Sequence, residues 1–473
     1  MFVDPKVRRA SFQVFAHKVS MLLAFLIILP FGTLMLLEGQ PGATDPGVRG
    51  GPAGAGGPIS GLSAGETTFF NEGLDRFVEI DSVLGKITGE AGVGLGPRFN
   101  LNSCVGCHAQ PAIGGTSPLT NPQVGVANLD GATNTVPFFI TTNGPVREAR
   151  FIFKPDGTRD GGVHDLFTIT GRWDAEGCNI SQPDFNAAAG NHNLIFRIPT
   201  PTFGGGLVEA IEDSAIVANM NSHLSTKKAL GISGHPNTNG NDGTITRFGW
   251  KAQNKSLELF VSEAYNVEQG VTNEIFPNER DETPGCLFNG TPEDHTNFTA
   301  TIPTGVPSDA AGFALFIRFL APSTPAPATN STAAGFNLFN HIGCALCHTP
   351  TLKTGPSSSS ALSNKPVNLF SDLLVHHMGP GLADNIVQGN AGPDEFRTAP
   401  LWGLGQRIFF LHDGRTTDLL QAIEAHASSS EDCEDGTTPE GFACNSEADA
   451  VIQRFNALSQ SQKQNILNFL RSL

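Results

Sequence analysis

Two copies of a Cys-x-x-Cys-His motif carry the clearest chemistry in the sequence. The motifs consist of Cys104, Cys107 and His108 and of Cys344, Cys347 and His348. This spacing is the attachment signature of a c-type haem, in which both thiols bond to the haem vinyl groups and the histidine becomes an iron ligand. On a helical turn the first and fourth positions share a face and the fifth lies beside them, so the imidazole points at the metal. The pattern predicts two covalently bound c-type haems.

A zinc ion held by the four motif cysteines is the alternative interpretation. Such a site leaves His108 and His348 without a role, although each directly follows a cysteine pair. The haem interpretation accounts for all the motif residues, and we prefer it.

The bulk composition indicates a folded protein of two or three domains. The chain has 473 residues, of which 39% are hydrophobic and 16% are charged, as in ordinary globular proteins. Its 54 glycines and 32 prolines indicate long ordered loops. The formal net charge of −16 excludes a nucleic-acid-binding function, which needs a cationic surface. It permits a basic soluble redox partner.

The N-terminus has the pattern of an export segment. Basic residues precede an apolar run over residues 21–37, and the next charged residue is Glu38. We expect residues 1–40 to be a signal peptide or an N-terminal membrane anchor, and we favour cleavage, with Ala43 as the candidate site. In either case we expect the rest of the chain in the periplasm, which agrees with attachment of c-type haem after export.

Four cysteines lie outside the haem motifs. Cys433 and Cys444 flank a short acidic loop, and Cys178 and Cys286 lie in the middle of the chain. In an oxidising compartment an even number favours two disulfides, Cys433–Cys444 and Cys178–Cys286. Four free thiols are the alternative.

We expect a mainly α fold with two cytochrome c-like helical haem modules and a long loop-rich insert with minor β structure. Residues 41–61 are rich in glycine and proline and predict a flexible linker. Residues 62–330 form the N-terminal haem module with its insert, and residues 331–473 form the C-terminal module. Phe-Asn-Leu precedes both motifs, at Phe99 and at Phe336, as in a weak internal repeat.

Local patterns place the main elements. Ser63 and Glu66 form a capping-box pattern at a helix start. The expected strands are residues 136–140 and 149–153, and the expected helices start near residue 203 and cover residues 257–265, 310–320 and 459–473. Residues 322–332 read as a linker.

The C-terminal part resembles the C-terminal haem domain of bacterial di-haem cytochrome c peroxidases and of the related enzyme that matures methylamine dehydrogenase. The resemblance rests on residues 396–403, 410–415 and 420–426. In that superfamily the residue fourteen positions past the histidine of a His-x-Gly element is the distal ligand of the C-terminal haem. The element is at His412, so the resemblance implies that His426 is the distal iron ligand opposite His348. By residue type alone, the candidates for the distal ligand of the second haem are, after the second motif, His376, His377, Met378, His412 and His426.

Further stretches are similar to the di-haem oxidoreductase family, sometimes labelled thiol oxidoreductases. They are residues 94–115, 162–167, 199–211, 248–251 and 278–282. The resemblance implies a peroxidase-like enzyme, and calcium between the modules occurs in the related peroxidases. No residues here identify calcium ligands, and no redox Cys-x-x-Cys remains for a thiol chemistry.

If the second haem has two histidine ligands, it is a relay and chemistry belongs to the first haem. Peroxide cleavage there needs a group that moves a proton. Glu209, at the start of a helix after a glycine-rich bend, is our first candidate, and capping that helix is its alternative role. His164 is the second, as a proton shuttle or sixth ligand, and a solvated loop histidine is its alternative role.

Few side chains are easily oxidised. The chain has one tyrosine and five methionines against 34 phenylalanines. We interpret Trp173, Trp250 and Trp402 as packing residues in preference to electron relays.

Two functions follow. The first is a periplasmic di-haem peroxidase-like enzyme that takes electrons from a small cytochrome or cupredoxin and passes them from the C-terminal haem to a reactive N-terminal haem and a small oxidant such as peroxide. The alternative is a non-catalytic di-haem electron carrier.

Overall fold

The computed structural model describes residues 42–428 and 443–473, and residues 42–473 cluster as one compact unit. The expected export segment and Cys433 lie outside the described residues, so the Cys433–Cys444 disulfide stays a prediction. Across those two described ranges, no helix combines the length and the apolar character needed to cross a membrane.

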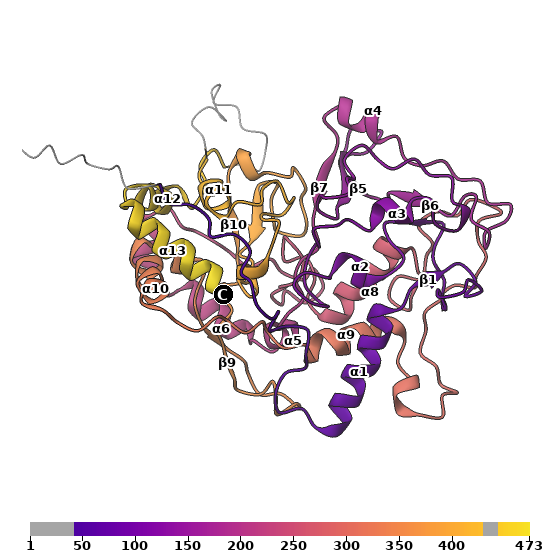
Figure 1. Ribbon diagram of the computed structural model, residues 1–473, viewed down its shortest axis with the longest axis horizontal. Coiled ribbons are helices and arrows are strands. Elements are labelled where there is room, and N and C mark those ends of the chain that lie inside the picture. Colours follow the sequence, from indigo (N-terminus) through magenta and orange to yellow (C-terminus); the bar gives the residue numbers. More distant parts are fainter. Residues whose placement is uncertain (1–41, 429–442) are drawn as a thin grey trace, which may run out of the picture. The chain divides into compact units, whose positions relative to one another are not determined.

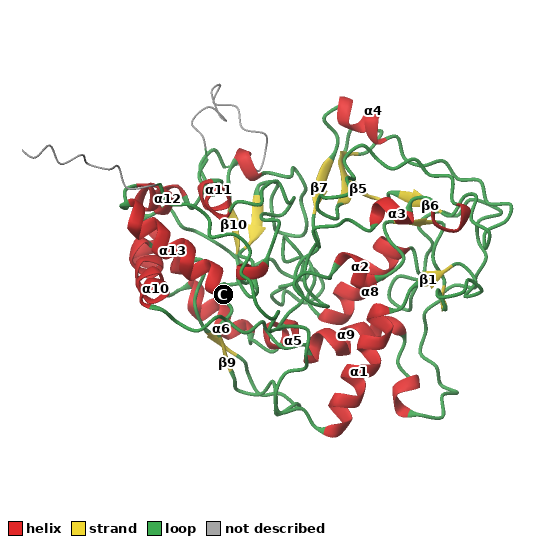
Figure 2. Ribbon diagram, in the orientation of Figure 1, coloured by secondary structure: helices red, strands yellow, loops and turns green. Residues whose placement is uncertain are grey.

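Helices cover more of the described chain than the short strands do, and long loops connect these elements (Figures 1 and 2). The α-helices are α1 (Ala64–Val78), α2 (Cys104–Cys107), α3 (Gln123–Val126), α4 (Phe185–Gly190), α5 (Gly205–Glu209), α6 (Asp213–Met220), α7 (Leu224–Ala229), α8 (Leu257–Gln269), α9 (Asp309–Phe319), α10 (Asn330–Ile342), α11 (Leu419–Glu424), α12 (Asp449–Asn456) and α13 (Gln460–Ser472). The 3-10 helices are η1 (Leu129–Gly131), η2 (Pro303–Gly305), η3 (Cys344–Leu346), η4 (Pro380–Leu382) and η5 (Leu404–Gln406). The strands are β1 (Asp81–Ser82), β2 (Gly92–Val93), β3 (Arg98–Phe99), β4 (Glu148–Phe153), β5 (Arg159–His164), β6 (Phe167–Thr168), β7 (Ile195–Arg197), β8 (Leu352–Lys353), β9 (Pro366–Val367), β10 (Val375–His377) and β11 (Glu395–Arg397).

Each haem motif follows a helix that crosses a later helix at a glycine. Helix α1 packs on α9, and α10 packs on α13. A Cβ on Gly73 of α1 would lie 2.3 Å from the Gly312 carbonyl oxygen, and one on Gly335 of α10 would lie 2.0 Å from the Asn465 carbonyl oxygen. Only glycine permits such close helix contact. The same arrangement thus occurs twice, once before each motif.

The helix starts agree well with the local sequence signals. Helix α1 begins at a capping box formed by Ser63 and Glu66, as predicted. Helices α8, α9 and α13 match the expected segments within a few residues at either end. Helix α10 starts at Asn330, inside the segment expected to be a linker.

The strands build small sheets in place of a large one. Strand β4 pairs antiparallel with β5 and β7, which confirms the expected strand at residues 149–153. Strands β3 and β6, β8 and β9, and β10 and β11 pair antiparallel, and β1 and β2 pair parallel. The strand expected at residues 136–140 is wrong, since this segment is a turn. It contains Pro137, which has no N–H to donate to a ladder.

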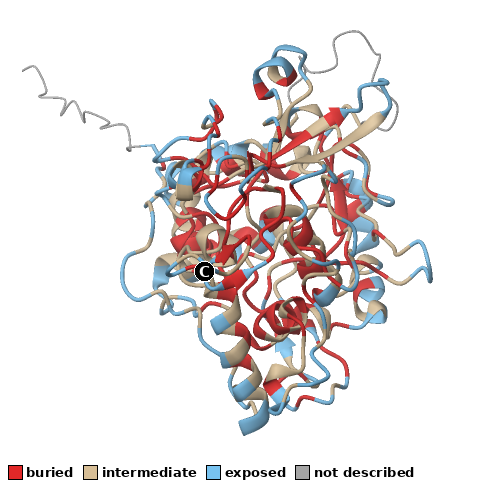
Figure 3. Cartoon of the chain, turned by 90° about the vertical axis from the view of Figure 1, so that its right-hand side faces the viewer, coloured by how far each residue is buried: buried red, intermediate tan, exposed pale blue. Residues whose placement is uncertain are grey.

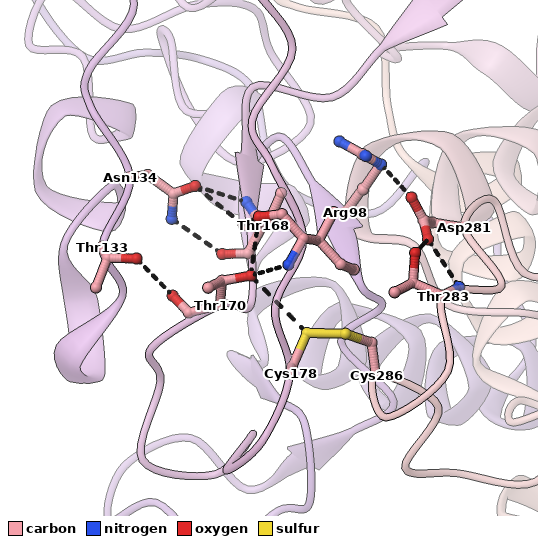
Figure 4. Close-up of a disulfide and its surroundings, with 10 residues drawn as sticks. Arg98, Thr133, Asn134, Thr168, Thr170, Cys178, Asp281, Thr283 and Cys286 are labelled. Atoms are coloured by element: carbon pink, nitrogen blue, oxygen red, sulfur yellow. Dashed lines mark hydrogen bonds and ion pairs between the residues drawn. A yellow bond between two sulfur atoms is a disulfide. The ribbon is translucent and has the colours of Figure 1, made fainter.

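A disulfide joins Cys178 and Cys286, as predicted (Figure 4). Cys178 also lies 3.9 Å from the Thr170 hydroxyl. Close by, Arg98 donates to Asp281 at 2.7 Å. These contacts tie the loop before α9 to the β3–β6 region.

Residues 42–61 contain no helix or strand, but they are held against the protein. Asp45 makes a buried ion pair of 2.6 Å with Arg471 of α13, and the Ile59 N–H donates to the Phe319 carbonyl. Long-range contacts that composition does not reveal thus hold the described part of the segment that we expected to be a linker. Figure 3 shows that buried residues follow the packed helices, whereas exposed residues gather in the outer loops.

Candidate functional site

The first motif lies on α2 and presents one free imidazole nitrogen. The His108 ring donates from Nδ1 to the Gly115 carbonyl oxygen at 2.9 Å. Because a carbonyl only accepts, Nδ1 carries the proton and the lone pair is on Nε2. Burial lowers the pKa of His108, which keeps the ring neutral. A neutral imidazole with an oriented second nitrogen is the form that binds a metal.

The second motif repeats this arrangement. The His348 ring donates from Nδ1 to the Phe370 carbonyl oxygen at 3.0 Å, and burial lowers its pKa to about 4. Phe339 of α10 packs 6.2 Å from the His348 ring, as Phe77 of α1 packs 6.1 Å from the His108 ring. Both histidines are therefore oriented by a backbone acceptor and an aromatic neighbour.

Each motif opens on a cavity. The first cavity is lined by Cys104, Cys107 and His108 among others. The second is lined mainly by apolar side chains and includes Cys344, Cys347 and His348. Each cavity is therefore lined by both cysteines and the histidine of one motif.

His426 faces His348 across the second cavity. The two ring centres are 6.5 Å apart, and the His426 ring donates from Nδ1 to the Ala422 carbonyl at 2.8 Å, which leaves its Nε2 free. Two metal–imidazole bonds of about 2.0–2.1 Å plus two ring radii give a centre-to-centre separation of roughly 6.4 Å. The spacing therefore fits one iron between the two rings.

Of the other candidate ligands, Met378 lines the second cavity, and the three remaining histidines contact other side chains. His376 contacts Glu447 with Nδ1 at 2.7 Å and Asp372 with Nε2 at 3.0 Å. His377 contacts Asp394 and Glu395 with its two ring nitrogens. His412 lines the second cavity but stacks on Phe396 with ring centres 4.3 Å apart.

Arginines without a carboxylate partner among the described residues line both cavities. Arg397 and the buried Arg407 line the second cavity, burial lowers the pKa of each to about 10, and Arg407 Nη2 has no hydrogen-bond partner among the described residues. Arg147 lines the first cavity, and its buried Nε has no partner among those residues either. The carboxylate side chains of a haem would supply the missing anions. The cavities thus fit haem in attachment residues, in iron ligands and in charge.

Among the described residues, the second cavity offers a second histidine for an iron, and the first cavity does not. The described residues that line the first cavity include no histidine besides His108, and no methionine or tyrosine. A haem bound to His108 therefore has one side without a protein ligand of these types, whereas the second cavity has a histidine on each side.

Carboxyl groups line the first cavity. They are Glu148, Glu263 and Glu268. Burial and the adjacent Glu148 raise the pKa of Glu268 well above its usual range, and burial raises the pKa of Glu263. A raised pKa widens the pH range over which a carboxyl group keeps a proton that it can donate. The sequence alone does not single out these glutamates, although the two on α8 share a helical face with Phe260, Ala264 and Val267.

The two predicted proton-transfer residues lie outside both cavity linings. Glu209 accepts from the Leu257 N–H at the start of α8 and pairs with Arg318 at 2.7 Å. His164 stacks on Phe151 with ring centres 3.6 Å apart and contacts the Gly161 carbonyl. The structure gives both a structural role, and their catalytic role stays a prediction without geometric support.

One tryptophan borders both cavities. Trp250 lines the first and the second cavity and donates from Nε1 to the Ile198 carbonyl at 2.9 Å. Trp402 is buried, donating to the Asn368 carbonyl, and Trp173 is exposed. Trp250 is therefore the tryptophan that contacts both cavities, whereas Trp402 and Trp173 line neither.

Apart from the two motif histidines and His426, the described residues contain one compact cluster that could bind a metal ion. It consists of Cys347, Asp372 and His376. Calcium prefers oxygen ligands, so this cluster does not suit it. The calcium expected from the resemblance stays a prediction.

The family comparison identifies the class of protein. The model of the family described as "Di-haem oxidoreductase, putative peroxidase" matches residues 148–473. The chain belongs to this family. The matched residues include the second motif and α8, whereas the first motif, at residues 104–108, lies outside the matched range.

Solved structures with similar features are distant. Hydrazine synthase from Kuenenia stuttgartiensis is 18% identical, with a TM-score of 0.21, over 40% of this chain and 59% of that one. The diheme peroxidase BthA from Burkholderia thailandensis is 14% identical, with a TM-score of 0.29, over 48% of this chain and 65% of that one. A MauG-like protein associated with microbial copper homeostasis is 15% identical, with a TM-score of 0.28, over 58% of this chain and 90% of that one.

This oxidoreductase spans less than two thirds of the first two structures, and the scores are too low to transfer site residues. No curated protein matches the chain.

Proposed function

We propose that this oxidoreductase is an exported di-haem c-type cytochrome that reduces a peroxide at its first haem with electrons from its second haem. The observation that carries the proposal is the asymmetry of the cavities. His348 and His426 oppose each other across the second cavity, whereas His108 has no such counterpart among the described residues that line the first. A haem held only by His108 supplies an iron that binds and reduces a peroxide oxygen.

The carboxyl groups of the first cavity supply protons. Peroxide reduction consumes two electrons and two protons and yields two waters. Glu268 lines the cavity with a raised pKa, so it keeps its proton to a higher pH than an ordinary glutamate, and Glu148 is adjacent to it. We assign the Glu148–Glu268 pair as the proton donor in place of the two residues expected from sequence.

Trp250 provides the path for electrons between the cavities. Its ring borders both linings, and an aromatic ring between two redox groups shortens each transfer step. The electrons enter at the second haem from a small periplasmic cytochrome or cupredoxin. The net charge of −16 favours a basic donor.

Export agrees with two features. Basic residues precede the apolar run at residues 21–37, which is typical of an export signal. The Cys178–Cys286 disulfide is typical of an oxidising compartment such as the periplasm.

Spectra of the purified haem-loaded protein test the proposal. We expect one high-spin and one low-spin haem at rest, and a spectral change of the high-spin haem on adding hydrogen peroxide. Two low-spin haems that stay inert to peroxide, both oxidised and half-reduced, would refute the proposal and favour a non-catalytic electron carrier.

A glutamate pair on one helix tests the proton donor. Glu268→Gln should slow peroxide reduction by about 10²–10⁴-fold and alter the dependence of the rate on pH. Glu258→Gln is the matched control, because Glu258 is exposed on the same helix. Equal rates for both variants would show that Glu268 does not donate the proton.

A further inference from the structure

The chain contains a single tyrosine, and it is buried beside the first haem site. Tyr265 is 3% exposed in the middle of α8. The chain has 34 phenylalanines, so an aromatic ring alone does not require tyrosine. What distinguishes this position is the hydroxyl, which needs a partner in the protein interior.

The partner of the Tyr265 hydroxyl is a buried carboxylate. The hydroxyl forms a hydrogen bond with Asp81 of β1, which is 6% exposed. The Asp81 N–H donates to the Asn102 carbonyl at 2.8 Å. Asn102 lies two residues before Cys104, the first residue of the first haem motif. The phenol and its acceptor are therefore anchored to the segment that carries the haem attachment.

Helix α8 joins Tyr265 to the first haem site. Ala264 and Val267, on either side of Tyr265 in the sequence, line the first cavity. One turn further on, the Gln269 amide contacts Cys104 Sγ at 3.2 Å.

A chain of aromatic contacts leads from Tyr265 to the proximal histidine. The Tyr265 and Phe313 ring centres are 5.0 Å apart, those of Phe313 and Phe77 are 6.2 Å apart, and those of Phe77 and His108 are 6.1 Å apart. These separations are those of packed aromatic rings. Electrons thus have a short, dry route between the phenol and the first haem site.

We propose that Tyr265 gives one electron to the first haem site during peroxide reduction while its phenolic proton passes to Asp81. The inference rests on the proposed peroxide reduction. The phenolic O–H bond breaks and an O–H bond forms on the Asp81 carboxylate, which leaves a neutral phenoxyl radical. The second electron comes from the second haem, and the radical is later reduced by an electron from the donor as the proton returns from Asp81.

The Asp81 carboxylate explains why this site suits the reaction. Removing only an electron would leave a cation in the apolar interior, which is strongly unfavourable. Proton transfer to an adjacent base avoids this charge. Of the other easily oxidised rings, Trp173 is 78% exposed, and Trp250 and Trp402 donate to backbone carbonyls, which are poor bases.

The proton acceptor makes the step depend on pH. Burial and the facing carboxyls of Glu79, Asp309 and Asp294 raise the pKa of Asp81 well above its usual range, and the Tyr265 hydrogen bond opposes this. Asp81 accepts a proton only when ionised. The yield of the radical should therefore rise with pH as Asp81 loses its proton.

The single tyrosine makes the test site-specific. Haem-loaded protein is produced with ring-deuterated tyrosine, mixed with hydrogen peroxide, frozen within milliseconds and examined by electron paramagnetic resonance. We expect an organic radical signal whose hyperfine structure narrows on deuteration, without any mutation. Tyr265→Phe should lose the signal, and Asp81→Asn should reduce it and remove its rise with pH. Trp173→Phe is the control and should keep the signal, and melting temperatures check that the variants fold.

The outcomes separate this inference from the proposed function. A peroxide-induced change of the haem spectrum without a deuteration-sensitive radical overturns the tyrosine proposal alone. A haem that does not react with peroxide overturns both. A deuteration-sensitive signal that is lost in Tyr265→Phe establishes the electron donor, and its survival in Asp81→Asn with unchanged pH dependence overturns the assignment of the proton acceptor.

Discussion

Replacing Arg407 tests whether the second cavity holds a haem by its carboxylates. Burial lowers the pKa of Arg407 from an ordinary value of about 12.5 to about 10. At about 1.36 kcal/mol for each pKa unit, this change corresponds to roughly 3 kcal/mol that a nearby anion must offset. The side chain is 6% exposed, so solvent does not screen the effect.

Arg407→Met in the haem-loaded protein leaves a buried haem carboxylate without its cation. We expect a loss of about 3–5 kcal/mol in the free energy of unfolding, the usual effect of removing one member of a buried ion pair. Arg407→Lys should recover part of this loss, because it keeps the charge but not the fork of donors. The reduction potential of the second haem should fall in Arg407→Met, since the lost cation stabilises the reduced form.

Equilibrium denaturation, followed by the absorption of the second haem, and redox titration measure these two effects. Arg454→Met is the control, because Arg454 is exposed on α12 and should change stability by no more than about 0.5 kcal/mol. The reasoning is wrong if Arg407→Met is as stable as the control and leaves the potential unchanged.

Three further predictions concern other parts of the molecule. His426→Ala should convert the low-spin second haem to high-spin, as seen in its absorption and magnetic resonance spectra, and an unchanged spectrum would refute the ligand assignment. Cys178→Ala with Cys286→Ala opens a crosslink over 108 residues and should destabilise the protein by up to about 4.8 kcal/mol in urea unfolding. No loss of stability would show that the disulfide does not restrict the unfolded chain. Burial raises the pKa of Glu293 to about 7, so the folded protein keeps a proton that the unfolded chain releases. Stability should therefore fall as pH rises from about 4.5 to above 7, and Glu293→Gln should flatten the profile; a profile unchanged by the substitution would contradict this.

Much of the local structure follows from sequence. The capping box at Ser63 and Glu66 starts α1 as predicted, because its hydrogen bonds join residues three positions apart. The strand at residues 136–140 was mispredicted because its apolar pattern suggested a strand although Pro137 cannot donate to a ladder. Residues 42–61 have the composition of a linker but are held by Arg471, at the other end of the chain.

In the candidate site, too, some residues cannot be identified from sequence because contacts between distant parts of the chain position them. The glutamates on α8 were missed because a carboxyl group on a helix is usually solvated, and only the fold turns Glu263 and Glu268 toward a cavity. Glu209 was preferred for its position at a helix start, but Arg318, far away in sequence, pairs with it. Trp250 gains its position from two linings that meet only in the folded chain.

The sequence by itself named the residues that could hold the cofactors. Each Cys-x-x-Cys-His motif lies within about one helical turn, so its geometry is local, and the resemblance of the segment around His412 was enough to name His426. The tertiary structure alone decided how the two motifs differ. The histidine that faces His348, the arginines without a carboxylate partner and the carboxyl groups of the first cavity depend on contacts between residues far apart in the chain. The two motifs are alike in sequence, and only their folded surroundings distinguish them.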